Sequence, residues 1–132
     1  MSKMENNTVN KAGSTGVELN LNDGTQRYQV TKKDLKKTAD RYNFMACNIF
    51  NYESQMGPAV AWAMAPVLRK IYKKDEEYKE ALNNHFNYFN STTVMSSMIL
   101  GATLAIEEKD GIEAKETVQS LKTSLMGPFA GV

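Results

Sequence analysis

The chain has 132 residues, of which 42% are hydrophobic and 23% are charged. This length suits a single domain with a core of its own. Sixteen basic and fifteen acidic residues nearly cancel, so the overall charge does not favour a nucleic-acid partner. The single cysteine, Cys47, excludes a disulfide framework within the chain. With the single histidine, His85, it cannot form a zinc site of the usual Cys/His type, and no cofactor is expected.

No secretory signal peptide is expected, because no charged stretch precedes an apolar one near Met1. The sequence contains no run of about 18–20 strongly apolar residues, so it predicts no ordinary transmembrane helix. Composition alone therefore favours a soluble or surface-bound helical domain.

Residues 1–30 form a polar zone rich in Asn, Ser, Thr and Gly, which is typical of a disordered tail. Within it, Leu19 and Leu21 alternate with polar residues, and Asp23-Gly24 precedes a second alternating run. An Asp-Gly pair between two such runs indicates a β-hairpin, here a weak one over residues 17–30.

From Thr31 the pattern becomes helical. Thr31 and Asp34 have the spacing of a capping box. A stripe of residues spaced by three and four predicts the buried face of the first helix: Leu35, Ala39, Tyr42, Ala46 and Ile49. The first half of this helix is basic, so it either lies on an anionic membrane surface or presents an ordinary solvated face. Its charged residues are Lys32, Lys33, Asp34, Lys36, Lys37, Asp40 and Arg41.

Gly57-Pro58 interrupts the chain, and residues 54–68 carry no charge. Residues 59–68 are predicted to form a short apolar helix with a kink at Pro66. Fifteen helical residues extend about 22 Å, at about 1.5 Å per residue. A bilayer core is about 30 Å thick, so this segment suits a buried, re-entrant or interfacial element.

The second half of the chain predicts three more helical segments. Asp75 is the expected N-cap of the first, and a loop is expected over residues 90–93. An apolar helix follows over residues 94–106 and ends in a charged turn over residues 107–111. The last helix carries a stripe of Val118, Leu121 and Leu125, and a Gly-Pro break is expected at residues 127–128.

Few residues offer catalytic chemistry. The chain has no Gly-rich phosphate loop, nucleophile elbow or His-Glu-x-x-His motif. His85 on an apolar helix face is either a hydrogen-bonded core residue or a general base. Glu53 is the only charged residue between Arg41 and Arg69. It is either a functional residue or a residue on the solvent-exposed face of an amphipathic segment. Cys47 is expected to be a small buried hydrophobe rather than a nucleophile.

Several stretches, taken in order, resemble the IID membrane subunit of the mannose/fructose/sorbose family of bacterial sugar phosphotransferase systems (PTS). They cover the region 31–132 and leave the tail unexplained. The matching stretches are Phe50-Asn51-Tyr52-Glu53 with the Pro66 segment 65–72, then 81–90 around His85, then 99–108, and finally 121–132. Two positions depart from the family pattern: Ser54-Gln55-Met56 stands where Arg-Met-Gln is common, and Ala59 replaces a usual glycine. The family also continues beyond the segment that matches 121–132, so we expect a truncated IID-like helical region.

The resemblance implies an all-α fold, namely the N-terminal part of a helical membrane subunit. It implies pairing with the IIC subunit, in a complex with IIA and IIB units, for uptake of a hexose-type sugar that IIB phosphorylates. The expected location is the bacterial cell membrane, with a cytoplasmic N-terminus. The subunit does not carry the phosphoryl group, so no catalytic residue is expected, and the fragment is expected to be inactive alone.

The resemblance also indicates site residues. Asn51, Tyr52, Glu53, His85 and Asn90 are expected to line the sugar pathway or to contact IIC, with His85 in a packing or polar-network role. Two alternatives remain open. One is a soluble helical adaptor, and the other is a small hydrolase or transferase that uses His85 and Glu53.

Overall fold

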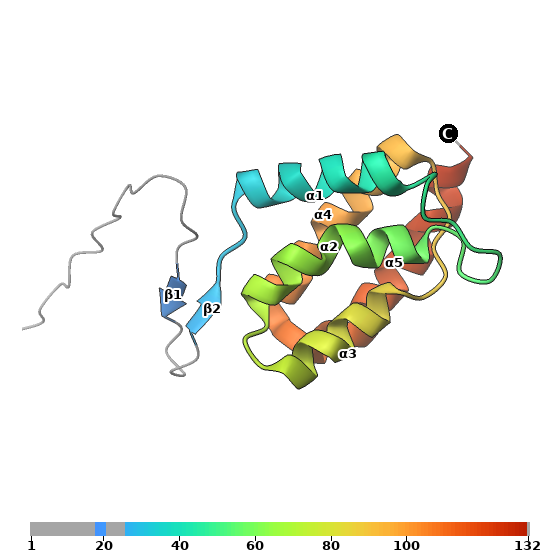
Figure 1. Ribbon diagram of the computed structural model, residues 1–132. Helices are drawn as coiled ribbons and strands as arrows, with labels where there is room; N and C mark the ends of the chain where they lie inside the picture. The colour runs from blue at the N-terminus through green and yellow to red at the C-terminus, as the bar shows by residue number, and fades with distance from the viewer. Residues whose placement is uncertain (1–17, 21–25, 132) are drawn as a thin grey trace, which may run out of the picture.

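The computed structural model describes residues 18–20 and 26–131. Within these residues, five α-helices pack into a bundle and two short strands pair beside it (Figure 1). The predicted all-α class is therefore confirmed for the bundle. The elements in chain order are β1 (Glu18–Asn20), β2 (Gln26–Tyr28), α1 (Lys32–Met45), α2 (Gly57–Ile71), α3 (Asp75–His85), α4 (Thr93–Asp110), the 3₁₀ helix η1 (Gly111–Ala114) and α5 (Lys115–Ala130).

The strands β1 and β2 pair antiparallel, with Glu18 opposite Tyr28. The expected turn at Asp23-Gly24 and most of the predicted tail 1–30 lie outside the described residues. The division of the chain at residue 30 therefore stays a prediction.

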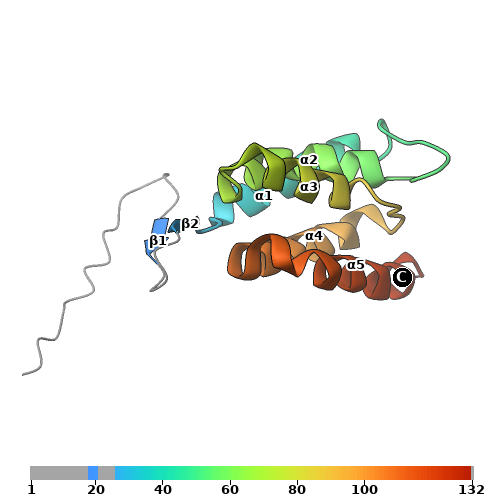
Figure 2. The same ribbon diagram turned by 90° about the horizontal axis from the view of Figure 1, so that it is seen from below.

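Successive helices run in opposite directions, which gives the bundle two different ends (Figures 1 and 2). One end, called here the loop end, holds the connections 46–56 and 86–92, the start of α4 and the end of α5. The other end, called here the charged end, holds the start of α1, the connection 72–74 and η1. The two ends differ in the charge of the residues that form them.

The start of α1 is capped as predicted. The Asp34 backbone N–H donates to Thr31 Oγ1 at 3.2 Å, and the Thr31 N–H donates to Asp34 Oδ2 at 3.2 Å. The Asp34 carboxylate is also buried, and it accepts hydrogen bonds from Lys70 Nζ at 2.7 Å and Tyr28 OH at 2.6 Å. Burial opposes ionisation, but the hydrogen bonds from Lys70, Tyr28 and Thr31 outweigh it and hold the pKa of this carboxyl well below its usual value.

The predicted stripe on the first helix is partly wrong. Tyr42 is buried, but Leu35 is exposed and Ile49 lies beyond the end of α1. Asp34 and Thr38 are buried in place of the expected apolar residues. The face is turned because the Asp34 carboxylate must reach its partners on β2 and α2.

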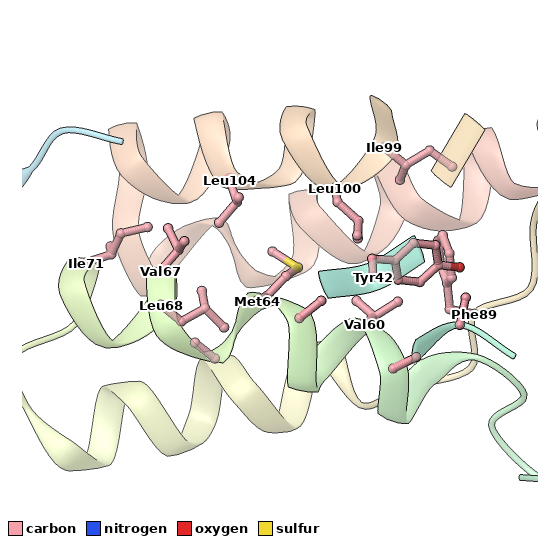
Figure 3. Packing of buried hydrophobic residues seen from close by; sticks show 14 of the residues in the cluster. Tyr42, Val60, Met64, Val67, Leu68, Ile71, Phe89, Ile99, Leu100 and Leu104 are labelled. Carbon is pink, nitrogen blue, oxygen red and sulfur yellow. The ribbon is translucent and has the colours of Figure 1, made fainter. Parts of the chain in front are cut away.

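Helix α2 lies at the centre of the bundle, and its buried face meets α1, α3 and α4 (Figure 3). Pro66 lies inside it, yet one helix runs from Gly57 to Ile71, longer than the predicted 59–68. Tyr42 and Phe89 close one end of the core with their rings edge to face, 6.2 Å apart. The other large residues of the core come from α2 and α4: Val60, Met64, Val67, Leu68, Ile71, Ile99, Leu100 and Leu104.

Two predicted breaks are absent from the structure. The charged turn expected over 107–111 is wrong, because α4 continues to Asp110 and ends at Gly111, which has a φ of 66°. The side chain of Glu107 is buried, so it belongs to the packed face of the helix rather than to a turn. The break at 127–128 is also wrong, since α5 includes Gly127 and Pro128 and ends at Ala130. Pro128 is so close to the helix end that few backbone hydrogen bonds depend on it.

Gly57 is where the two connections of the loop end cross. A Cβ at this position would lie 2.5 Å from the Asn87 carbonyl oxygen and 2.6 Å from the Phe86 carbonyl oxygen. Next to it, the Met56 N–H donates to the Phe89 carbonyl at 2.8 Å, and the Phe89 N–H donates to the Ser54 carbonyl at 3.2 Å. Only glycine allows the two backbones to approach this closely.

We predict that Gly57→Ala lowers the free energy of unfolding by about 1–3 kcal/mol, because two backbone oxygens must move to admit the methyl group. The matched control is Gly101→Ala in α4, where nothing lies within 4 Å of the added Cβ. That variant should gain roughly 0.5–1 kcal/mol from better helix propensity. Urea unfolding of both variants makes the comparison, and equal stabilities would contradict the close approach at Gly57.

Candidate functional site

The predicted residues Asn51, Tyr52 and Glu53 lie together in an exposed turn at the loop end. The turn is closed by a pair of backbone hydrogen bonds between Asn51 and Gln55, and Asn51 Oδ1 accepts the Ser54 N–H at 2.7 Å. Tyr52 is 95% exposed. Asn51 therefore shapes the turn, while the side chains of Tyr52 and Glu53 are free to meet a partner.

Asn90 lies at the same end of the bundle. The Phe89 hydrogen bonds to Ser54 and Met56 hold the connection 86–92 against the connection 46–56. Asn90 is exposed, and its backbone N–H donates to Met126 Sδ at 3.1 Å. It borders an open hollow of about 440 Å³ whose other lining residues are Tyr88, Gln119, Thr123, Met126, Gly127 and Ala130. Four of the five predicted site residues thus share the loop end.

The fifth predicted residue, His85, lies apart from them in the interior. It is fully buried at the end of α3, and its Nε2 lies 2.5 Å from Glu107 Oε1. Tyr72 OH donates to the other carboxylate oxygen of Glu107 at 3.2 Å. This cluster ties α3 and the end of α2 to the last turn of α4, which agrees with a polar-network role for His85.

Lys122 from α5 completes the buried cluster. Its side chain is fully buried, its ammonium lies 5.7 Å from the centre of the Phe89 ring, and Nζ has no hydrogen-bond partner. Burial lowers the pKa of Lys122 to about 8, although the negative charge of Glu107 opposes this change. Burial also lowers the pKa of His85, against the opposing effect of its hydrogen bond to Glu107. At neutral pH the imidazole of His85 is therefore neutral and the ammonium of Lys122 is charged.

This geometry does not support the hydrolase or transferase alternative. The structure pairs His85 with Glu107, whereas Glu53 is exposed on the loop-end turn. A buried imidazole is closed to a substrate in this conformation. The expectation for Cys47 is also wrong, because this cysteine is exposed. Within residues 18–20 and 26–131, no group of three His, Cys, Asp or Glu side chains is placed to hold a metal ion.

Sequence reasoning missed Glu107 and Lys122. Glu107 continues the buried face of α4, since it follows Leu100, Thr103 and Leu104 at helical spacing. Lys122 follows the buried Val118 by four residues in the same way. A charged residue that continues an apolar stripe was the available signal. For Glu107 this signal was hidden by the expectation of a charged turn over residues 107–111.

The family model EIID-AGA, described as "PTS system mannose/fructose/sorbose family IID component", matches residues 29–132. The chain belongs to this family. The match covers the whole helical bundle, and it does not favour the adaptor alternative. Among the described residues, no helix is both long and apolar enough to cross a membrane.

Three curated relatives agree with this assignment. The sorbose-specific EIID component of Lacticaseibacillus casei is 38% identical over 109 residues, which are 79% of this chain and 38% of the relative. The mannose-specific EIID component of Escherichia coli K12 is 34% identical over 111 residues, 78% of this chain and 39% of the relative. The fructose permease IID component of Bacillus subtilis is 33% identical over 108 residues, with coverages of 79% and 38%.

A solved structure is also similar. A chain in the complex of the mannose transporter ManYZ with microcin E492 superposes with a TM-score of 0.72 at 30% identity, over 79% of this chain and 39% of that one. The chain thus spans about two fifths of the length of the relatives that it matches.

We predict a pH dependence of stability that belongs to Lys122. Its pKa is about 8 in the folded chain and close to 10.4 when unfolded, so the unfolded state binds more protons between these values. The free energy of unfolding should therefore rise with pH, by roughly 2 kcal/mol between pH 8 and 10. Below about pH 7 the lysine is charged in both states and adds almost no slope.

The measurement is urea unfolding at several pH values in the wild type and in Lys122→Met, which keeps the length of the side chain. The rise should vanish in the variant. An exposed control, Lys79→Met, should keep it. A wild-type profile that matches that of Lys122→Met would contradict the buried position of this ammonium.

Proposed function

We propose that this chain provides the residue 29–132 portion of the membrane component IID of a mannose-family PTS permease. In this role it pairs with IIC in the bacterial cell membrane. The complete permease takes up a hexose-type sugar, which IIB phosphorylates with a phosphoryl group received from IIA. The observation that carries the proposal is the family match over the whole bundle.

The proposed role assigns no phosphoryl transfer to this chain. A phosphorylated histidine must expose a ring nitrogen to its donor, whereas His85 is buried and Nε2 is taken by Glu107. His85 therefore acts in packing, and the enzymatic step belongs to the other units of the complex.

The exposed turn is proposed as the contact with IIC or as part of the sugar pathway. Tyr52 and Glu53 project from a turn that Asn51 holds in shape, and Asn90 lies at the same end. A large aromatic side chain that is 95% exposed offers a strong contact to a partner. We further infer that the N-terminus is cytoplasmic, because the basic residues of α1 lie at the charged end of the bundle beside β2.

The experiment is a graft. Residues 29–132 replace the matching segment of the mannose-specific IID component of E. coli, in cells that lack that component. We predict that the chimera restores mannose uptake and co-purifies with IIC. In the chimera, Tyr52→Ala should lower the recovery of IIC by about tenfold, as expected for an interface aromatic. Lys79→Ala, exposed at the charged end, is the control and should leave the recovery unchanged.

Two results would count against the proposal separately. A chimera that reaches the membrane at normal levels but neither transports mannose nor binds IIC would overturn the subunit role. Normal recovery of IIC with Tyr52→Ala would leave that role intact and remove the contact assigned to the turn.

A further inference from the structure

Gln55 closes the exposed turn of the loop end in a backbone conformation that side chains rarely adopt. Among residues 18–20 and 26–131, it is the one residue other than glycine with a positive φ, at 53°. In this left-handed region a Cβ crowds the backbone, so glycine is the residue usually found there. The turn holds the conformation, because the Gln55 N–H donates to the Asn51 carbonyl at 3.0 Å and the Asn51 N–H donates to the Gln55 carbonyl at 3.2 Å.

The residues on both sides of Gln55 are tied to Phe89. The Ser54 carbonyl accepts the Phe89 N–H at 3.2 Å, and the Met56 N–H donates to the Phe89 carbonyl at 2.8 Å. The Ser54 carbonyl also accepts the Gly57 N–H at 2.9 Å. Phe89 is fully buried, so these hydrogen bonds connect the turn to the core. A strained backbone conformation persists only where its surroundings enforce it, and these contacts do so for Gln55.

The side chain of Gln55 makes a contact that glycine could not make. Its Nε2 donates to the backbone carbonyl of Tyr52 at 3.1 Å, within the turn. The hydrogen bond fixes the backbone from which the Tyr52 ring projects, while the side chain of Tyr52 itself stays 95% exposed. A residue with a long amide side chain thus occupies a position that favours glycine, and its amide holds the most exposed aromatic residue of the turn in place.

We propose that Gln55 is a positioning residue that holds Tyr52 in the orientation in which its partner binds it. A turn that is ordered before binding loses less conformational entropy on binding, so the complex is tighter than one formed by a mobile turn. The strained backbone is tolerated because it places an amide donor where glycine would have none. The inference rests on the proposed contact between the turn and IIC, and it identifies the residue that prepares this contact.

Two substitutions separate the amide from the backbone conformation. Gln55→Met keeps the length of the side chain and the strained backbone, but it removes the N–H donor to Tyr52. Gln55→Gly also removes the donor, and it relieves the strain because glycine adopts a positive φ readily.

Asn48→Ala is the matched control. Asn48 lies in the same connection, and its Nδ2 donates to the Phe44 carbonyl at 2.7 Å. The substitution therefore removes a comparable bond between a side-chain amide and a backbone carbonyl, but one that lies outside the turn.

The first measurement is the mobility of the turn, from backbone nitrogen relaxation in an NMR spectrum of the chain. The N–H groups of Tyr52 and Glu53 should have order parameters of about 0.85 in the wild type and in Asn48→Ala, as in a rigid backbone. In Gln55→Met and Gln55→Gly they should fall to about 0.6 or below. The Phe89 N–H should stay rigid in every variant, because its hydrogen bond to Ser54 does not involve the Gln55 side chain.

The second measurement compares the recovery of IIC by the chimera with the stability of the chain in urea. Both Gln55 variants should lower the recovery of IIC by about three- to tenfold, and Asn48→Ala should leave it unchanged. The urea midpoint of Gln55→Gly should not fall below that of the wild type, because the strain is relieved. A purely structural role of Gln55 would instead lower the recovery and the midpoint together.

Three results would overturn the positioning role alone. The first is normal recovery of IIC with both Gln55 variants while Tyr52→Ala lowers it, which would leave the proposed contact intact. The second is a turn that stays as rigid in Gln55→Met as in the wild type. The third is a lower recovery of IIC that is matched by a lower urea midpoint in Gln55→Gly.

Failure of the proposed function has a different signature. Normal recovery of IIC with Tyr52→Ala would show that the contact itself is wrong, and the inference about Gln55 would fail with it. A chimera that recovers no IIC while Gln55 is intact would overturn the subunit role and this inference together.

Discussion

The buried carboxylate of Glu107 is the constraint on which the rest of the structure depends. An unpaired charge in the interior would be very costly, so His85 and Tyr72 must reach its two oxygens, and the ammonium of Lys122 must stay near. These partners come from α3, from the end of α2 and from α5. The relative positions of the helices are therefore set by one polar centre as well as by the apolar core around Met64.

The hydrogen bond to Glu107 also sets His85 apart from the other predicted site residues. His85 is held in the interior by Glu107, whereas Tyr52 is 95% exposed at the loop end, where we propose that it contacts a partner. The close crossing of backbones at Gly57 holds the two loop-end connections together. The loop end then presents the exposed turn around Tyr52 on a rigid support.

Local patterns in the sequence predicted much of the fold. The capping box at Thr31 and the helical class of the bundle rest on short-range spacing, and the structure confirms both. The predictions that proved wrong concern residues whose positions depend on tertiary contacts. The charges of residues 107–110 were predicted to form a turn, because nothing local reveals that Glu107 has a buried partner 22 residues away at His85. The exposure of Leu35 has the same origin, since Asp34 turns its helix toward Lys70 on α2.

The most direct test of the buried centre is the titration of its imidazole. His85 is the only histidine, so its ring signals in an NMR spectrum are unambiguous. Burial lowers its pKa, so the ring should take up a proton only at a pH below the ordinary histidine value while the chain remains folded. A folded chain in which His85 takes up a proton at the ordinary histidine pKa or above would contradict this prediction, because burial would then not outweigh the opposing effect of Glu107.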